Sequence, residues 1–370
     1  MNFRYFWGLS KRVLWVTNMI FVALFLLACA SRFFNPQSFP LLALMSIAFP
    51  FFLLCVIAFL VWWLFVKSRW ALLSGIALLI GWSNINNFFA FHFSATFKEE
   101  KQKGDIRVAT WNVARFVELV RNNNKGSQTR YKMLQQIKRT NADILCFQEF
   151  TSSINPDWYN NVIAVTKGLG YPYHFFSHDY NGEHFFTGSV IFSRFPIVDT
   201  GMVRFPRPTL SEPLVFADIK KGNKLFRVYT THLQSNQLLK QDFDRLKALK
   251  EGKSIRGNSS RLFAKLSFAI QMRSIQADVV ANLMENSPHP TIFCGDMNDV
   301  PNSYCYHAVR GDKQDAFLKK GFGIGRTFRK LSPTIRIDYI FADKDFKINQ
   351  FKRITTDYSD HYMLVTDMSL

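Results

Sequence analysis

Several short apolar runs in this sequence lead directly into, or out of, side chains that can bind a metal ion or transfer a proton. These side chains are Asn112, Glu149, His232, Asp296, Asn298, Asp338, Asp360 and His361. In layered sheets, the side chains at neighbouring strand ends meet at one rim. We therefore expect four carboxylates, two imidazoles and two carboxamides to share one site.

The carboxylates of this expected rim need a compensating positive charge. Four carboxylates in one pocket repel one another, and the repulsion raises their pKa values. A divalent cation removes this cost, and the oxygen donors of Asp, Glu and Asn suit Mg²⁺, Mn²⁺ or Ca²⁺ better than Zn²⁺. The sequence therefore predicts a hard divalent cation as cofactor and leaves the histidines free for proton transfer.

The chain after Gly104 has the pattern of a layered α/β or α+β domain. Short apolar runs predict buried strands at residues 106–111, 143–147, 189–192, 225–230, 291–294 and 337–341. Helical patterns cover residues 131–140 and 262–284. Asn112, Glu149, His232, Asp296, Asn298 and Asp338 then lie at or near a strand end, and Asp360 and His361 precede a last apolar run.

The ordered motifs TWNV, FQE, THL, GDMN, IDYIF and SDH resemble those of the endonuclease/exonuclease/phosphatase superfamily. This superfamily includes DNase I-like nucleases, neutral sphingomyelinases and inositol-polyphosphate 5-phosphatases. The resemblance covers about Ile106 to Leu370. It implies an α/β (α+β) four-layer sandwich, in which two packed β-sheets are flanked by helices.

The same resemblance implies roles for the oxygen-donor residues. Glu149 resembles the principal metal-binding glutamate, and Asn112 and Asp360 resemble the residues that complete or support that site. Asp296 and Asn298 resemble the pair that orients the attacking water and the phosphate, and that pair is also a candidate for holding a second metal.

The resemblance also implies roles for the two histidines. His361 resembles the histidine that contacts the scissile phosphate and assists as a base, with Asp338 fixing its tautomer. His232 resembles the second histidine of the nuclease I, sphingomyelinase and 5-phosphatase branches. Its acidic partner in nuclease I-like members comes from an Arg-Glu-Pro stretch, to which Ser211-Glu212-Pro213 corresponds without the arginine. Glu212 is the resulting candidate.

The first 97 residues have the composition of membrane-spanning helices. No Asp or Glu precedes Glu99, and long uncharged runs are rich in Leu, Phe, Ala, Ile and Val. About 20 apolar residues span a bilayer as a helix, so we predict spans near 13–34, 41–65 and 70–91, with interfacial tryptophans at Trp62, Trp63 and Trp70. The predicted domains are a membrane anchor at 1–97, a juxtamembrane linker at 98–104 and a catalytic domain at 105–370.

Two alternatives apply to the first span. It has the charged and apolar regions of a signal peptide, although its apolar region is too long for one. The tetrapeptide Leu26-Leu27-Ala28-Cys29 resembles a lipoprotein processing box, which would lipidate Cys29 and remove the span. The two later spans would anchor the chain in either case.

The charge distribution favours an anionic partner. Six cations lie at or before Phe97, which leaves 40 cations against 27 acids, a net charge of +13, in residues 98–370. Part of this charge is clustered just after His232, at Lys240, Arg245, Lys247, Lys250, Lys253, Arg256, Arg261 and Lys265. Such a segment is either a solvated face or a basic lip that attracts phosphate.

Together these features predict a membrane-anchored, metal-dependent phosphoesterase that hydrolyses phosphodiester bonds and is nuclease-like by resemblance. The alternatives on the same fold are a phospholipid or sphingomyelin phosphodiesterase and an inositol-phosphate phosphatase. A non-catalytic membrane receptor is disfavoured, because degenerate members lose metal ligands or histidines that are present here. The predicted partners are a phosphoester substrate and the lipid bilayer, with no protein partner.

The short flanks of the spans predict the orientation in the membrane. With three spans, one side carries Arg4, Lys11, Arg12, Lys67 and Arg69, and the other carries Arg32, Lys98, Lys101 and Lys103. The side with more Lys and Arg is usually cytoplasmic, so the catalytic domain is predicted on the exoplasmic or periplasmic side of the cytoplasmic membrane. A reporter fused after Leu370 should be active only outside the cytoplasm; activity confined to the cytoplasm would reverse this topology.

Overall fold

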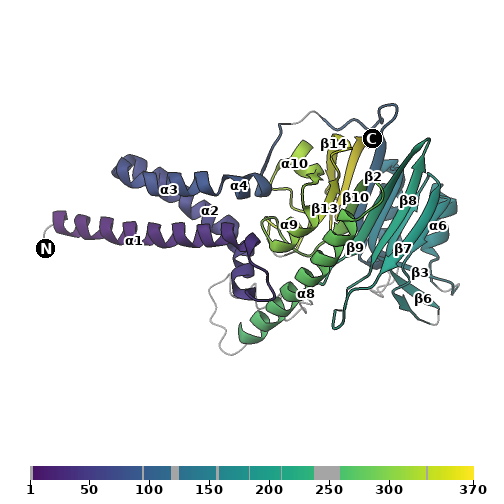
Figure 1. The fold of residues 1–370 in the computed structure, drawn as a ribbon, viewed down its shortest axis with the longest axis horizontal. Coiled ribbons are helices and arrows are strands. Elements are labelled where there is room, and N and C mark those ends of the chain that lie inside the picture. The colour runs from purple at the N-terminus through teal and green to yellow at the C-terminus, as the bar shows by residue number, and fades with distance from the viewer. Residues whose placement is uncertain are drawn as a thin grey trace.

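The computed structural model describes residues 3–93, 96–117, 125–155, 158–182, 184–209, 211–236, 259–330 and 332–370. Within these residues two mixed β-sheets pack face to face, and an arm of helices extends from one side of them (Figure 1). Of the predicted basic cluster, Arg261 and Lys265 are described, whereas Lys240, Arg245, Lys247, Lys250, Lys253 and Arg256 lie outside the described residues.

The first sheet has the strand order β14-β15-β2-β3-β6-β4, with β5 paired to β6. Its only parallel pair among the described strands joins β2 and β3. The strands are β2 (Ile106–Asn112), β3 (Ile144–Ser153), β4 (Tyr173–Phe176), β5 (Tyr180–Asn181), β6 (Phe185–Ser193), β14 (Lys347–Ile354) and β15 (Met363–Ser369).

The second sheet has the strand order β11-β13-β10-β9-β8-β7. Here β9 and β10 are parallel, and the other described neighbours are antiparallel. The strands are β7 (Ile197–Val203), β8 (Leu214–Lys221), β9 (Lys224–His232), β10 (Thr291–Asp296), β11 (Gln314–Asp315) and β13 (Asp338–Ala342).

Alternating apolar residues from both sheets form the central core. Val108 and Ile144 of the first sheet pack in one cluster with Val228 and Ile292 of the second. The outward faces carry further apolar residues, as expected for strands covered on both sides. Helices α5 (Lys125–Thr140) and α6 (Asn161–Leu169) cover the first sheet, and α8 (Ser259–Glu285) and α9 (Tyr304–Arg310) cover the second. The predicted four-layer sandwich is therefore confirmed.

The apolar N-terminal region forms a bundle of helices. They are α1 (Phe3–Ala30), η1 (Ser31–Phe33), α2 (Pro40–Val66), α3 (Ser68–Ile80) and α4 (Trp82–Phe88). Two helical stretches, Ser10–Phe33 and Pro40–Val66, are long and apolar enough to cross a membrane. They correspond to the first two predicted spans.

The third predicted span, 70–91, corresponds to two helices, α3 and α4, that meet at Gly81. Helix α3 has only 13 residues, about 20 Å at 1.5 Å per residue. A Cβ atom on Gly81 would lie 2.5 Å from the ring of Phe25, so the glycine lets α1 pack closely at the break. Beyond the helices, β1 (Ala90–Phe91) pairs with β12 (Phe322–Gly323) of the sheet domain.

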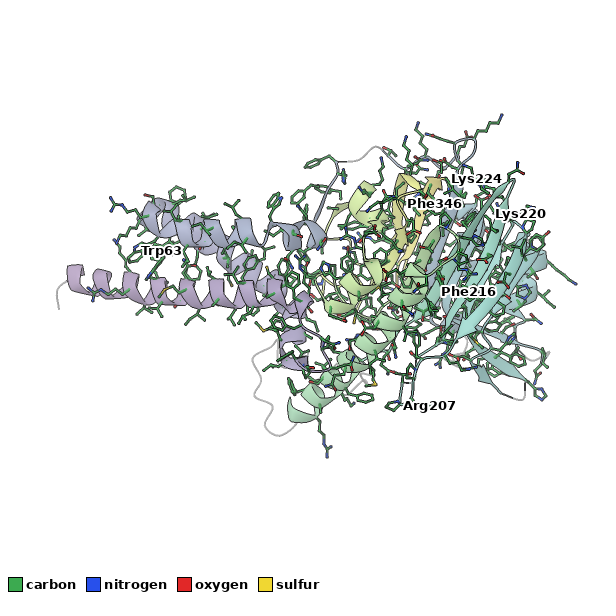
Figure 2. All side chains as sticks on the ribbon, in the orientation of Figure 1. Trp63, Arg207, Phe216, Lys220, Lys224 and Phe346 are labelled. Atoms are coloured by element: carbon green, nitrogen blue, oxygen red, sulfur yellow. The ribbon has the colours of Figure 1, made fainter. Side chains whose placement is uncertain are left out.

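The tryptophans near the α2–α3 turn pack on one another. Trp63 is fully buried among the helices, where Trp15 and Trp70 contact it with ring centroids at 6.1 and 4.8 Å. Figure 2 shows Trp63 in the helical arm, well away from the sheets. Trp62 is 44% exposed, and the interfacial position of these tryptophans stays a prediction.

The last carbonyl groups of α4 are bound by the sheet domain. A helix leaves its final carbonyls without partners inside the helix. Arg336 donates to one of these, the Asn87 carbonyl, at 2.7 Å, and Asn302 donates at 3.0 Å to the Asn84 carbonyl, which lies earlier in the helix. Arg336 also forms a buried ion pair with Asp315 at 2.7 Å. Helix α4 is therefore joined to the loops that lead into α9 and β13.

Loss of Arg336 should destabilise the protein strongly. Arg336→Ala leaves Asp315 buried without its cation, which costs about 3–5 kcal/mol in comparable pairs. The matched control is Lys344→Ala, since Lys344 pairs with Asp312 at 2.8 Å on the surface and such pairs contribute about 0–1 kcal/mol. The check is denaturant unfolding of the full chain in detergent. Equal losses in both variants would contradict the role given to Arg336.

Candidate active site

The strand register brings the chemically active residues to one end of the two sheets. Parallel pairing sets His232 of β9 beside Asp296 of β10, and antiparallel pairing sets Asp296 beside Asp338 of β13. In the other sheet, parallel pairing sets Asn112 of β2 beside Gln148 of β3. Lys220 and Lys224 mark the opposite end of the second sheet (Figure 2). The register thus gathers side chains that are far apart in the sequence.

Asn112 links the two sheets at this end. Its Nδ2 group donates to Glu149 Oε1 at 3.1 Å and to Asp296 Oδ2 at 3.0 Å. Its Oδ1 atom accepts the backbone N–H of Ala114 at 3.0 Å, and the residue is fully buried. One carboxamide therefore holds a carboxylate from each sheet at the centre of the site.

A bulge in β3 orients Glu149. The pairing of β3 with β6 shifts between Phe147 and Phe150, so that two residues of β3 occupy the place of one. Glu149 has a φ of 48°, a left-handed conformation that costs a non-glycine residue about 1–3 kcal/mol and is common at functional sites. Bulges of this kind redirect side chains, and here the result is a half-buried glutamate beside Asn112.

The imidazole of His361 is held by Asp338. Nδ1 of His361 lies 2.9 Å from Asp338 Oδ2, and Nε2 lies 3.6 Å from Asp296 Oδ2. Trp111 Nε1 donates to the His361 carbonyl at 2.9 Å. Burial by itself lowers the pKa of His361, but the carboxylates of Asp338 and Asp296 outweigh it and raise the pKa to about 10.

His232 has a similar arrangement on the other side of Asp296. Its Nδ1 lies 3.8 Å from Glu212 Oε1, and its Nε2 lies 3.7 Å from Asp296 Oδ2 and 4.0 Å from Glu149 Oε1. Burial lowers the pKa of His232, but Glu212, Asp296 and Glu149 outweigh it and raise the pKa to about 10. Glu212 is fixed by the Ser189 hydroxyl and by the backbone N–H of Glu149.

The remaining two predicted residues lie beside this cluster. The backbone N–H of Asn298 donates to Asp296 Oδ1 at 2.9 Å, while its side-chain Nδ2 donates to the Leu233 carbonyl at 3.0 Å. The carboxylate of Asp360 pairs with Lys330 at 2.7 Å. His361 and Lys330 together lower the pKa of Asp360, although burial raises it. The structure therefore joins Asn298 to Asp296 and directs Asp360 toward a lysine.

The donor set fits a hard divalent cation. Single ligand atoms of Asp296, Asp338 and His361 lie within 4.8 Å of one another, and all three residues are buried. Glu149 adds an oxygen donor from the first sheet, and Asn112 faces the same cluster with its Nδ2 group. The two raised histidine pKa values have the same origin, because the cluster holds more negative charge than its hydrogen bonds compensate. A cation at this position would supply the positive charge that the cluster lacks.

Some neighbours of the site were not singled out from the sequence. The side chain of Arg115 is exposed, and its Nε lies 3.9 Å from Glu149 Oε2. Because Arg115 follows the TWNV motif closely, its place in the sequence could have identified it. Ser189 gives no comparable signal, since it lies inside an ordinary strand run. Asp179 is a further charged neighbour, and its carboxylate pairs with Arg204 at 2.9 Å. Burial and the charge of Glu212 raise its pKa to about 6, although Arg204 and His232 act against them.

Comparison with known proteins identifies the family of the sheet domain. Residues 109–361 match the family model described as Endonuclease/Exonuclease/phosphatase family. Residues 11–88 match a model described as a domain of unknown function (DUF8431). No curated protein matches the chain.

Two solved structures show the same fold. One is an endonuclease/exonuclease/phosphatase from Beutenbergia cavernae DSM 12333, with 20% identity and a TM-score of 0.51, covering 72% of each chain. The other is the human nocturnin catalytic domain with a bound sulfate anion, with 19% identity and a TM-score of 0.50, covering 72% of this chain and 94% of that one. The family model spans well over half of the sequence, so the chain belongs to the endonuclease/exonuclease/phosphatase family.

Proposed function

We propose that this chain is a membrane-anchored phosphoesterase that hydrolyses a phosphodiester bond with the help of a divalent cation. The observation that carries the proposal is the arrangement of the two imidazoles. His361 and His232 each face a carboxylate with Nδ1, and both direct Nε2 to within 3.7 Å of the same Asp296 oxygen. Two oriented proton-transfer groups beside a carboxylate cluster suit hydrolysis of an anionic ester.

The proposed cation site uses Glu149 as its principal ligand. Asn112 and Asp296 are the nearest additional donors, and a rotation of the Asn112 amide would present Oδ1 in place of Nδ2. Asp360 belongs to this site by resemblance, and its use as a ligand requires release from Lys330. Mg²⁺ is the proposed ion, with Mn²⁺ or Ca²⁺ as substitutes. When bound, the ion would stabilise charge on the phosphoryl oxygens and lower the pKa of water.

The proposed roles of the histidines follow from their partners. Asp338 fixes the tautomer of His361, so Nε2 is the atom that exchanges a proton with the attacking water or the phosphate. His232, supported by Glu212, stabilises or protonates the other side of the phosphate. Asp296 orients the water, and Asn298 supports Asp296 through its backbone N–H. A cation that neutralised part of the carboxylate charge would lower the pKa values of both histidines toward neutrality.

The proposed substrate is a nucleic acid phosphodiester. The net charge of +13 in residues 98–370 favours a polyanion. The second candidate, hydrolysis of a phospholipid or sphingomyelin headgroup, is favoured by the apolar helices that are joined to the domain through Arg336 and Asn302. An inositol phosphate would combine both features. The full chain should be assayed on plasmid DNA, sphingomyelin and a phosphoinositide in parallel, because removal of α4 would expose buried contacts; no turnover on any of them would contradict the proposal.

The proposed location is the cytoplasmic membrane. Helices α1 and α2 are long and apolar enough to cross it, and α3 with α4 completes the anchor at residues 1–97. The catalytic domain at 105–370 is proposed to lie on the exoplasmic or periplasmic side, as the charge distribution predicts.

Removal of the cation should abolish hydrolysis without unfolding the domain. The core consists of two packed sheets and does not depend on the metal. EDTA should suppress turnover, Mg²⁺ or Mn²⁺ should restore it, and Glu149→Gln should weaken the metal dependence most. Glu285→Gln, at the exposed end of α8, is the matched control. Full activity in excess chelator would disprove the metal assignment.

Loss of either site histidine should lower kcat. His361→Ala and His232→Ala should each reduce kcat by at least about 10²-fold, with little change in metal affinity. Asp338→Asn should resemble a weaker His361→Ala, since the imidazole remains but is poorly oriented. The double histidine variant should be less impaired than the product of the single losses.

The matched control for these variants is His289→Ala. His289 lies just before β10, at the opposite end of the sheet from Asp296. Steady-state kinetics on the same substrate provides the measurement. If His232→Ala kept near-full kcat on every phosphoester tested, His232 would be a structural residue and the two-histidine mechanism would be wrong.

A further inference from the structure

The first part of α8 projects beyond the sheet that the rest of the helix covers. From Ala269 onward, α8 contributes buried residues, and Ala277 and Val280 pack in the core of the second sheet. Before Ala269, Phe263 and Phe268 are each 44% exposed. This end of the helix therefore presents two aromatic side chains outside the protein core.

This projecting part of α8 lies beside the connection between α1 and α2. Gln271 Nε2 donates to the Gln37 carbonyl at 3.3 Å. Figure 1 shows the N-terminal end of α8 reaching back to the level at which α1 ends. The α1–α2 connection also exposes aromatic side chains, with Phe33 71% and Phe39 52% exposed. Exposed aromatic residues from two distant parts of the chain therefore lie near the end of α1.

We propose that residues 261–268 of α8 and the α1–α2 connection form a membrane-contact surface in the headgroup region of an anionic phospholipid bilayer. The inference rests on the proposed anchoring of α1 and α2. If those helices cross the bilayer, the connection between them lies at its surface, and the contact with Gln37 fixes α8 at the same depth.

The chemistry of the projecting helix suits this environment. Arg261 is exposed, and Lys265 lies one turn further along the same side of the helix, so this side carries positive charge that would attract lipid phosphates. Phe263 lies on the opposite side, and Phe268 lies near the two cations. Aromatic side chains on both sides, together with cations, suit a helix end immersed in the headgroup layer. A protein partner would be expected to cover one face only.

The surface would also fix the active site relative to the membrane. Arg273 of α8 donates to the Gln234 carbonyl at 2.9 Å, and Gln276 accepts the backbone N–H of Gln234 at 2.8 Å. Arg273 also lies 3.4 Å from Asp299. The loops that follow His232 and Asn298 are thus tied to the helix whose other end meets the lipid.

Photochemical crosslinking to lipid tests the proposal on the full chain. A photoreactive phenylalanine analogue replaces Phe263 or Phe268 in protein reconstituted into phosphatidylcholine vesicles that contain labelled phosphatidylglycerol. The negative control is position Val198, 55% exposed on β7 of the sheet domain, and the positive control is Leu54, 66% exposed on α2. Positions 263 and 268 should capture at least about fivefold more lipid than position 198.

The controls separate this surface from the anchoring. Lipid capture at Leu54 with only background capture at 263 and 268 would overturn the surface and leave the anchor intact. Background capture at Leu54 would overturn the anchor and with it the surface. Crosslinks at 263 to a second copy of the chain, in place of lipid, would also overturn the proposal. Arg261→Gln with Lys265→Gln should reduce capture of phosphatidylglycerol at 263; unchanged capture would contradict the role of the cations.

Discussion

The buried carboxylate of Asp296 is the constraint on which the site depends. A carboxylate without contact to water must be compensated by hydrogen bonds and positive charge, or it becomes neutral. Asn112 supplies a hydrogen bond from the other sheet, the backbone of Asn298 supplies a second, and His232 and His361 approach from both sides. The nearby carboxylates add more negative charge than these groups offset, and this excess is the basis of the proposed cation site.

The pairing of the strands brings the partners of Asp296 together. Asp296 can be reached from both sheets only because β2 and β10 end at the same edge of the sandwich. The pairing of β10 with β9 and β13 then fixes His232 and Asp338 on either side, and the β3 bulge turns Glu149 inward. Helices α8 and α4 support the loops that follow these strands, so the apolar arm and the active site are parts of one packed structure.

Much of this could be predicted because a strand end is a local signal. An apolar run that stops at His232 or Asp296 identifies both the strand and the active residue, and the ordered motifs identify the family. The pairing of His361 with Asp338 also followed from the resemblance. These predictions needed neither a three-dimensional neighbour nor an exact register.

The features that could not be predicted depend on contacts between distant segments. Gly81 is unremarkable in an apolar run, and its close approach to Phe25 depends on how the helices pack. Trp63 has the sequence position of an interfacial residue, yet neighbouring helices bury it. Asp360 was expected to face a metal, and its pairing with Lys330 depends on how a separate loop packs.

Direct binding of Mn²⁺ to the full chain, followed by electron paramagnetic resonance, tests the central claim without an assumed substrate. The account predicts saturable binding that weakens at least about tenfold in Glu149→Gln and in Asp296→Asn. The control Glu285→Gln should bind as the unaltered protein does. Equal Mn²⁺ affinity in all four proteins would contradict the claim that the carboxylates around Asp296 form a cation site.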